Sequence, residues 1–472
     1  MKKHFLLVSI LLLTAFISQA QWQPDVKLSN GSGSSYTTYY SNARCIASSG
    51  DTVHVVWSDN RNSGNWEIYY KRSTDGGINW GADTRISNNI YLSSNPSLAI
   101  SGSMVHVVWD DNRDGNNEIY YNRSTDGGIS WGTDTRLTND TSLSRNPCVS
   151  ASGSEVQVVW NDYNTLAIFY KRSADGGINW SPAIPLINNS GPSSWYPSVS
   201  ESGSVVHVVW LDGRGGQANI YYKRSEDGGE TWGADFPLTN NSITGYSDSP
   251  SMSVSGSDVQ VVFRDTRAGG YGIYSKHSTD GGINWSIDKR VSEGNITEHC
   301  PSVSVIDSLV NVVWYGDRDG NPEIYYNHSA DAGQSWRTDM RLTNDAAVSV
   351  FPFVAASNSA VHVVWQDYRD GNAEIYYKRN PTGNTVGIKE LPSAGMPVAI
   401  FPNPASTEIK IQSLENIKEL TITDIYGKEI YHSKILNPKP ELLIPVSDYP
   451  AGIYFIKVKK GNKISVQKFI KQ

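Results

Sequence analysis

The chain has 472 residues, among them 15 Trp, 26 Tyr and 41 Gly but only 3 Cys, and its formal charge is −7. This composition excludes a disordered, collagen-like or disulfide-stapled protein, and the length predicts several domains. Acidic residues (47) outnumber basic ones (40). This balance argues against nucleic acid as a partner, because phosphate binding needs a basic surface.

The first twenty residues have the pattern of an export signal. Lys2 and Lys3 precede an apolar run from Phe5 to Ile17, and Ser18–Ala20 provides a small-residue cleavage site. The run is shorter than a membrane-spanning helix requires, so we expect residues 1–20 to be cleaved rather than to anchor the protein. Because no later segment is long and apolar enough, we also expect no transmembrane segment in the mature protein.

Residues 21–384 contain seven copies of a repeat. A Val-Val-Trp motif recurs at intervals of 50 to 53 residues, and its last residues are Trp57, Trp109, Trp160, Trp210, Phe263, Trp314 and Trp365. A small-residue strand that usually starts at a proline precedes each motif, and a second aromatic run such as Glu118–Tyr121 follows it. Each copy therefore predicts three consecutive strands.

A second motif, Ser-x-Asp-x-Gly-x-x-Trp, follows six of the seven copies. We expect its Asp to accept hydrogen bonds from turn amides, its Gly to be left-handed and its Trp to wedge between strands, which are structural roles. The six aspartates are Asp75, Asp126, Asp175, Asp227, Asp280 and Asp331. A fourth strand follows each of these turns, as at Trp131–Thr138.

The seventh copy breaks off at Arg379–Pro381, and its missing fourth strand matches Trp22–Ser29. Four short strands in a unit of about fifty residues are typical of a propeller blade. The sequence therefore predicts an all-β fold, with a seven-bladed β-propeller over residues 21–384 that closes by pairing its N- and C-terminal strands. The second motif is the Asp-box (BNR repeat), and residues 21–384 resemble the sialidase superfamily throughout.

Composition changes after residue 384. Residues 385–472 lack Trp and Arg and carry a charge of +4, whereas 26 basic and 39 acidic residues give residues 21–384 a charge of −13. Apolar residues alternate in Glu408–Leu414, Leu420–Tyr426 and Ile453–Val458. This pattern predicts a small C-terminal β-sandwich at residues 397–472, after a linker at residues 385–396.

Three motifs of this tail, Phe401–Ala405, Ile422–Lys428 and Tyr449–Tyr454, resemble the C-terminal sorting domain of type IX secretion in Bacteroidota. The resemblance implies that the secretion machinery recognises the tail and moves the protein across the outer membrane, after the signal has taken it through the inner membrane. We therefore expect a secreted or cell-surface protein. An accessory sugar-binding or adhesive sandwich is the alternative interpretation of the tail.

A recurring Asp, Arg and Glu follow the second strand, in loops on the propeller face opposite the Asp-box turns. Arg61 and Arg113 belong to complete sets of this kind. The arginine either staples its own loop between two carboxylates or joins others in binding a carboxylate or sugar hydroxyls. In two middle copies the Glu is replaced, so Arg214 and Arg267 lose one presumed partner and are predicted to face a ligand.

Thirteen of the 15 tryptophans belong to the repeated motifs, which leaves Trp66 and Trp195. Both, with loop tyrosines such as Tyr246, either fill gaps between blades or provide aromatic surfaces that stack on sugar rings. The repeat-position histidines have no metal-ligand spacing, and acidic loops such as Asp317–Asp319 favour solvated turns over calcium binding, so we predict neither a metal nor a cofactor. His299 beside Glu298 is the candidate acid–base pair.

Three functions remain open. Near-identical blades favour an exported glycan-binding, lectin-like propeller with several weak equivalent sites for glycans or glycoconjugates. The sialidase resemblance implies an exo-glycoside hydrolase with three arginines, a Tyr–Glu nucleophile and an acidic general acid. Sialidases usually have six blades, however, and their Arg-Ile-Pro motif is absent, so no catalytic residue is assigned. The third alternative is a protein-binding scaffold at the cell surface.

Overall fold

The structure is a computed structural model, and it describes residues 22–38, 43–62, 64–187, 193–214, 216–240, 245–267, 269–293, 297–357, 360–382, 398–403, 405–424, 428–460 and 463–472. The chain divides into two units, Met1–Asn384 and Thr385–Gln472. The predicted export signal (1–20) and linker (385–396) lie outside the described residues. No helix in the described ranges is long and apolar enough to cross a membrane.

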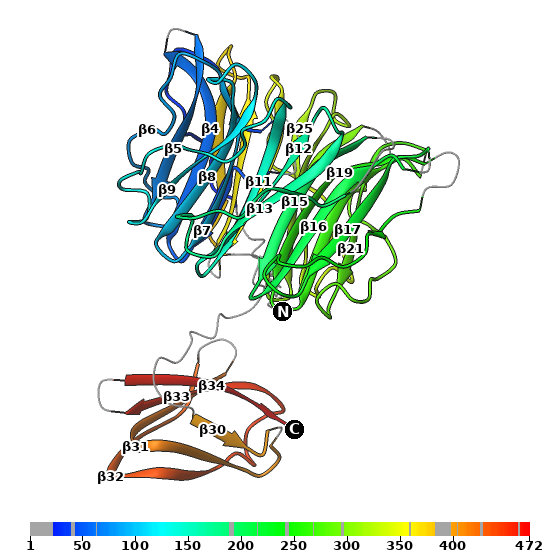
Figure 1. The fold of residues 1–472 in the computed structure, drawn as a ribbon. Helices are drawn as coiled ribbons and strands as arrows, with labels where there is room; N and C mark the ends of the chain where they lie inside the picture. The colour runs from blue at the N-terminus through cyan, green and yellow to red at the C-terminus, as the bar shows by residue number, and fades with distance from the viewer. Residues whose placement is uncertain are drawn as a thin grey trace, which may run out of the picture. The chain divides into compact units, whose positions relative to one another are not determined.

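The first unit consists of seven antiparallel sheets, which Figure 1 shows from the side. Their innermost strands surround a central channel. Each sheet is one blade, and its innermost strand contributes to the channel lining. Successive sheets follow one another along the chain, so the blades are numbered 1 to 7 in sequence order. The all-β fold and the seven-bladed propeller are therefore confirmed.

The blades contain the following strands. Blade 1 consists of β2 (Ser35–Tyr36), β3 (Ile46–Ser49), β4 (Thr52–Asn62), β5 (Asn65–Ser73) and β6 (Thr84–Arg85). Blade 2 consists of β7 (Ser93–Ser101), β8 (Met104–Asp111), β9 (Glu118–Ser124) and β10 (Thr135–Arg136). Blade 3 consists of β11 (Ser144–Ser152), β12 (Glu155–Asp162), β13 (Ala167–Ser173) and β14 (Ile184–Pro185). Blade 4 consists of β15 (Ser194–Ser202), β16 (Val205–Asp212), β17 (Asn219–Ser225) and β18 (Phe236–Pro237). Blade 5 consists of β19 (Ser247–Ser255), β20 (Asp258–Asp265), β21 (Gly272–Ser278) and β22 (Lys289–Arg290). Blade 6 consists of β23 (Glu298–Ile306), β24 (Leu309–Gly316), β25 (Glu323–Ser329) and β26 (Met340–Arg341). Blade 7 consists of β27 (Ser349–Ser357), β28 (Ala360–Asp367), β29 (Glu374–Asn380) and β1 (Val26–Lys27).

The second strand of each blade is buried on both faces, because a propeller packs every sheet between two others. Trp109 of β8 is fully buried against Val56, Ile68 and Tyr70 of blade 1. The same packing recurs at the end of each Val-Val-Trp strand, so the repeated apolar residues form one hydrophobic cluster per pair of neighbouring blades. None of the three cysteines forms a disulfide, and all three are buried.

The Asp-box turns also join neighbouring blades. Each box aspartate accepts a hydrogen bond from the backbone amide four residues later, as Asp126 does from Ser130 at 2.9 Å. The box tryptophan packs edge-on against a tyrosine of the preceding blade, as Trp131 does against Tyr70 with ring centroids 4.9 Å apart. The tryptophan therefore contributes to the interface between blades.

The ring closes as predicted. Strand β1 pairs with β29, with Val26 opposite Tyr377. Trp22 takes the position of an Asp-box tryptophan and packs edge-on on Tyr326 of blade 6 at 5.0 Å, while Trp80 of blade 1 packs in the same way on Tyr377 at 4.9 Å. The two ends of the propeller sequence thus complete one sheet, and the contacts between blades continue around the ring.

One interface differs from the other six. Blade 5 has Ser275 where other blades place the interface tyrosine, so Trp336 of blade 6 lacks the tyrosine ring that the other turn tryptophans contact. Phe263 also replaces the fully buried tryptophan of this blade. The interface between blades 5 and 6 therefore lacks the edge-on tryptophan–tyrosine contact that the other six share.

The second unit is a five-stranded antiparallel sheet that bends over its own core. Strand β31 pairs with β30 near its start, with β33 near its end and with β32 along most of its length. Ile411, Leu420, Ile456 and Phe469 are fully buried in this core. This arrangement confirms the predicted small β-sandwich, whose strands are β30 (Val398–Phe401), β31 (Glu408–Asp424), β32 (Glu429–Pro445), β33 (Gly452–Lys460) and β34 (Lys463–Lys471).

Candidate functional site at the rim of the central channel

The recurring arginines hold their own blades together. Arg113 donates from Nε to Asp111 at 2.9 Å and from Nη2 at 2.6 Å, and its Nη1 donates to Asp134 at 2.9 Å. The guanidinium also covers the ring of Tyr120 at 4.2 Å. Arg61 makes the equivalent contacts with Asp59, Asp83 and Tyr69. These arginines staple the second-to-third loop to the start of the outermost strand.

The glutamate predicted as the second partner of each staple lies elsewhere. Glu118 accepts from Arg136 at 2.8 Å and from the hydroxyl of Thr138, both on or just after β10. The second carboxylate comes instead from an aspartate about twenty residues after the arginine. The sequence prediction was wrong here because the outermost strand runs back along the blade and brings that aspartate within reach.

This correction changes the interpretation of Arg214 and Arg267. Arg214 binds Asp212 at 2.7 Å and Asp235 at 2.6 Å, and Arg267 binds Asp265 at 2.7 Å together with Asp288. Each arginine thus keeps two carboxylate partners although the Glu is absent. The premise that they had lost a partner was wrong, and it no longer distinguishes them from Arg61 and Arg113 as ligand-binding residues.

The staples also fix the charge of the buried aspartates. Burial acts to raise the pKa of Asp111, but hydrogen bonds from Arg113, Trp109 and Ser93 outweigh it and hold that pKa below its usual range. The same balance lowers the pKa of the corresponding aspartates in blades 1, 4 and 7. These ion pairs are therefore part of the scaffold at neutral pH.

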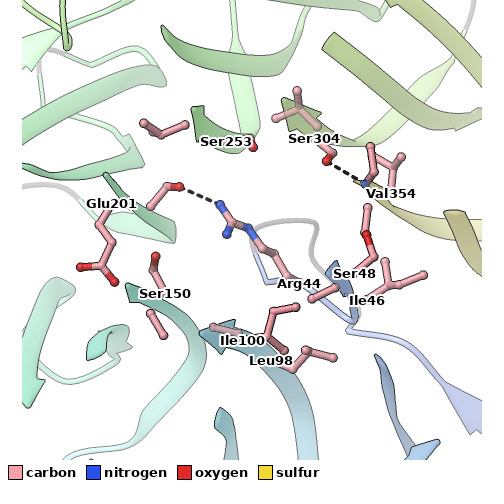
Figure 2. A pocket seen from close by; sticks show the side chains of 18 residues that line it. Arg44, Ile46, Ser48, Leu98, Ile100, Ser150, Glu201, Ser253, Ser304 and Val354 are labelled. Carbon is pink, nitrogen blue, oxygen red and sulfur yellow. Dashed lines mark hydrogen bonds between the residues drawn. The ribbon is translucent and has the colours of Figure 1, made fainter. Parts of the chain in front are cut away.

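The central channel contains a cavity of about 200 Å³, lined by the innermost strands of all seven blades. Figure 2 shows Arg44 pointing into this ring of strands, where its Nη2 donates to the Ser200 hydroxyl at 3.0 Å and to the Met252 carbonyl at 2.9 Å. Arg44 thus connects blade 1 with blades 4 and 5. It is the last residue of a longer segment in blade 1, where residues 37–44 replace the dipeptide found at Asn95–Pro96 in blade 2.

One end of the channel carries residues that differ in every blade. In this position, a residue near the start of the innermost strand faces the residue that follows the Val-Val-Trp motif. We call these seven pairs the rim: Tyr36–Ser58, Ser94–Asp110, Arg145–Asn161, Trp195–Leu211, Asp248–Arg264, His299–Tyr315 and Val350–Gln366. Residues needed for the blade structure are the same in every blade. Residues that differ between blades at the same strand position are therefore available for function.

Aromatic residues singled out in the sequence lie at or beside this rim. Trp66 stacks on the rim residue Tyr36 with centroids 4.6 Å apart, and the rim residue Trp195 packs edge-on against Tyr163 at 4.7 Å. Both tryptophans occupy the ends of strands rather than the loops expected for them. Tyr246 immediately precedes β19 and is 38% exposed. The structure thus brings these predicted residues to one end of the channel.

The most polar part of the rim joins blades 5 and 6. Arg264 donates from Nε to Asp248 at 2.6 Å, its Nη2 also binds that carboxylate, and its Nη1 contacts Nδ1 of His299 at 2.5 Å. The Tyr271 ring covers the guanidinium at 4.4 Å. Neither Arg264 nor Asp248 was singled out in the sequence, although aligning the seven copies would have shown both as departures from the repeat.

Two buried carboxyl groups near the rim have raised pKa values. Burial raises the pKa of Asp110 to about 6, against the opposing effect of hydrogen bonds from Asn95 and Ser94. Burial also raises the pKa of Glu298 to about 7. The predicted Glu298–His299 pair does not form: Nη1 of Arg318 lies 3.7 Å from Glu298, whereas His299 contacts Arg264, because neighbouring strand residues point to opposite faces.

Within the described ranges, no group of three or more His, Cys, Asp or Glu residues is placed to hold a metal ion. The repeat-position histidines serve the scaffold instead. Nδ1 of His106 lies 2.8 Å from the Tyr121 hydroxyl, and the same contact recurs at His54, His207 and His362.

Residues 399–472 match the family described as the secretion system C-terminal sorting domain. The tail is a type IX secretion sorting domain. The sorting domain indicates export by type IX secretion, to the cell surface or into the medium. No curated protein matches the chain.

Several solved structures are similar to the chain. A protein of unknown function from Dyadobacter fermentans is 14% identical with a TM-score of 0.48, over 62% of this chain and 95% of that one. A Hadza microbial sialidase is 15% identical with a TM-score of 0.42, over 69% and 73% of the two chains. A Trypanosoma rangeli sialidase is 10% identical with a TM-score of 0.45, over 94% and 88%.

Proposed function

We propose that this exported protein is a glycan-binding propeller of the sialidase superfamily, and that its ligand binds at the rim. The observation that carries the proposal is the contrast between repeated and divergent residues. The repeated arginines are held in staples, whereas the rim differs in every blade and combines part-exposed aromatic rings with hydrogen-bonding side chains. Sugars bind to such surfaces by stacking on aromatic faces while polar groups contact their hydroxyls.

The rim favours one asymmetric site over several equivalent ones. Blade 1 presents Tyr36 stacked with Trp66, blade 4 presents Trp195, and blade 5 presents the Asp248–Arg264 pair. Equivalent lectin sites would need the same residues in each blade, which the rim does not provide. We therefore replace the expectation of repeated weak sites by a single glycan site.

A sialidase-type exo-glycoside hydrolase is the second candidate, and two observations favour it. Arg44, Arg145 and Arg264 stand apart from the repeat, and all three belong to the rim or to the cavity below it. In addition, the raised pKa of Asp110, about 6, suits a general acid. Release of sugar from a sialylated or other glycan, with its loss in Asp110→Asn, would support hydrolysis over binding alone.

A glycan array probed with the purified protein tests the proposal. We expect binding that weakens about tenfold in Trp66→Ala and in Trp195→Ala, because each substitution removes an aromatic contact from the site. Phe236→Ala is the matched control, since that ring is 49% exposed on the outermost strand of blade 4. Unfolding midpoints close to that of the parent protein must accompany the comparison.

Three outcomes decide between the functions. Binding without turnover that depends on both tryptophans supports the glycan-binding propeller. If the protein binds no glycan, or binds equally in all three variants, the rim is not a sugar site and the protein-binding scaffold becomes the better account. Turnover would move the assignment to the hydrolase.

A further inference from the structure

His299 lies between two aromatic rings at the blade 5–6 part of the rim. Its ring centroid is 5.1 Å from that of Tyr315, with the planes 21° apart, and 5.9 Å from that of Tyr271, at 31°. Tyr315 in turn packs edge-on against Phe351 of blade 7 at 5.4 Å. The imidazole orientation is therefore fixed by one ring from blade 5 and one from its own blade, and Phe351 of blade 7 supports the second of these rings.

The contact with Arg264 sets the position of the ring proton. An arginine side chain has only donors, so Nη1 of Arg264 can approach Nδ1 of His299 only when that nitrogen carries no hydrogen. Asp248 holds the guanidinium through both Nε and Nη2, which leaves Nη1 directed at the imidazole. The neutral ring must then carry its hydrogen on Nε2.

The other ring nitrogen is available for a ligand. Nε2 of His299 has no hydrogen-bond partner among the described residues, and this nitrogen is not buried. His299 itself is partly exposed. The donor is thus fixed in direction, unpaired and accessible at the rim.

We infer that His299 is a specificity-determining residue of the rim, and that its Nε2–H donates to an acceptor oxygen of the bound glycan. The inference rests on the proposed function, because it names the donor by which that site selects its sugar. A fixed donor discriminates against a sugar that lacks the matching acceptor, since the buried or oriented group is then left unpaired.

Acid should weaken this contact. Burial and the charge of Arg264 both lower the pKa of His299, whereas Asp248 and Asp317 oppose this effect, and Tyr271 and Tyr315 face the ring without charge. A second proton would have to enter at Nδ1, where Arg264 donates. Protonation of His299 therefore disrupts the contact that orients the donor, and we expect affinity to fall as the pH drops below the ordinary titration range of histidine.

Two conservative variants separate the two ring nitrogens. His299→Asn keeps an acceptor near the position of Nδ1 but removes the donor at Nε2, whereas His299→Gln places an amide N–H near Nε2. We expect His299→Asn to lose about tenfold in affinity for the glycan found by the array, and His299→Gln to recover part of it. A deoxy analogue that lacks the contacted oxygen should bind the parent about as weakly as the intact glycan binds His299→Asn.

The tautomer has a readout that needs no glycan. Selective ¹⁵N labelling of histidine in the full chain distinguishes a protonated Nε2 from a protonated Nδ1 by NMR, and the His299→Asn spectrum assigns the signal. An Nδ1–H tautomer, or an unchanged affinity in His299→Asn, overturns this inference while leaving glycan binding at the rim intact. Failure to bind any glycan, with the Nε2–H tautomer observed, overturns the proposed function and with it this role for His299.

Discussion

In blade 6 one carboxylate next to the stapling arginine has moved to the innermost strand, where Glu298 lies 3.7 Å from Nη1 of Arg318 and Asp339 remains the hydrogen-bonded partner. Six blades place a serine on the innermost strand opposite an aspartate, as at Ser93 and Asp111, and in five of them this aspartate binds the stapling arginine. In blade 6 the pair is Glu298 opposite Gly316. A Cβ at position 316 would lie 3.3 Å from the backbone oxygen of Thr297, which is a tight contact, and 3.7 Å from the Glu298 carboxyl carbon, which is an ordinary one.

This exchange predicts strong coupling between the two positions. Gly316→Asp alone would set a second carboxylate beside the first, and Glu298→Ser alone would leave Arg318 with Asp339 as its remaining carboxylate partner. We expect each single variant to lose about 1–3 kcal/mol of unfolding free energy. The double variant, which restores the usual serine–aspartate pair, should regain most of that loss.

Urea unfolding of the four proteins measures this coupling. The parent, the two single variants and the double variant form one cycle, and the coupling energy should be at least about 1 kcal/mol. Additive losses in the double variant would show that Glu298 does not substitute for the aspartate of the other blades.

At the scale of the strand, the buried histidines predict acid sensitivity. Burial, with the charge of Arg123, lowers the pKa of His106 to about 4 from an ordinary value of 6.5. The unfolded chain therefore binds a proton that the folded blade excludes, so stability is complete above about pH 6.5 and is lost as the pH falls toward 4. His54 and His207 have the same shift for the same reason.

Another blade supplies the substitution that tests this effect. Gln157 occupies the corresponding position of blade 3 and accepts a hydrogen bond from Tyr170. We predict that His106→Gln reduces the stability lost between pH 8 and pH 5 by about 2 kcal/mol, as measured by urea unfolding at both values. The reciprocal Gln157→His should steepen the loss. An unchanged pH dependence in His106→Gln would mean that this histidine is not the group that titrates.

Strand order was readable from the sequence, whereas many side-chain partners were not. The Val-Val-Trp spacing, the Asp-box and the Trp22–Ser29 match identified seven blades and their closure, because each depends on a local pattern repeated along the chain. The partner of Arg113 depends on how β10 lies beside β9, which spacing alone does not reveal. The nearby Glu118 was therefore chosen instead of the more distant Asp134.

For a similar reason, only part of the candidate site could be predicted from the sequence. Trp66, Trp195 and Tyr246 were visible because they lie outside the repeated motifs. The other rim residues occupy ordinary strand positions, and only their differences from blade to blade distinguish them. Arg44 was missed because the longer segment that it ends obscures the repeat, and nothing in its local sequence indicates that its side chain enters the channel.

For the whole molecule, closure depends on a strand from the opposite end of the propeller sequence. Asp25 binds Arg369 at 2.8 Å and Lys378 at 2.9 Å, just as Asp235 binds Arg214 and Lys223 within blade 4. The two aspartate side chains are equally exposed, at 19%. Of the two, only Asp25 lies next to a strand, β1, that comes from the other end of the propeller sequence than the rest of its blade.

We predict that Asp25→Asn destabilises the propeller by at least about 1 kcal/mol more than Asp235→Asn, because it releases a terminal strand as well as an ion pair. Urea unfolding compares the two variants. Limited proteolysis should cut near residues 22–29 faster in Asp25→Asn than in the control. Equal losses with equal cleavage would show that the ring remains closed without this contact.

The missing tryptophan–tyrosine contact between blades 5 and 6 has a consequence for ligand binding. Local opening of a closed ring is easiest where neighbouring units are held least, and this interface has Ser275 in place of the tyrosine that the other turn tryptophans contact. The Arg264–His299 contact crosses the same interface. A ligand held by both blades would bridge the interface that lacks this tryptophan–tyrosine contact, so that occupancy of the rim and cohesion of the propeller rise together.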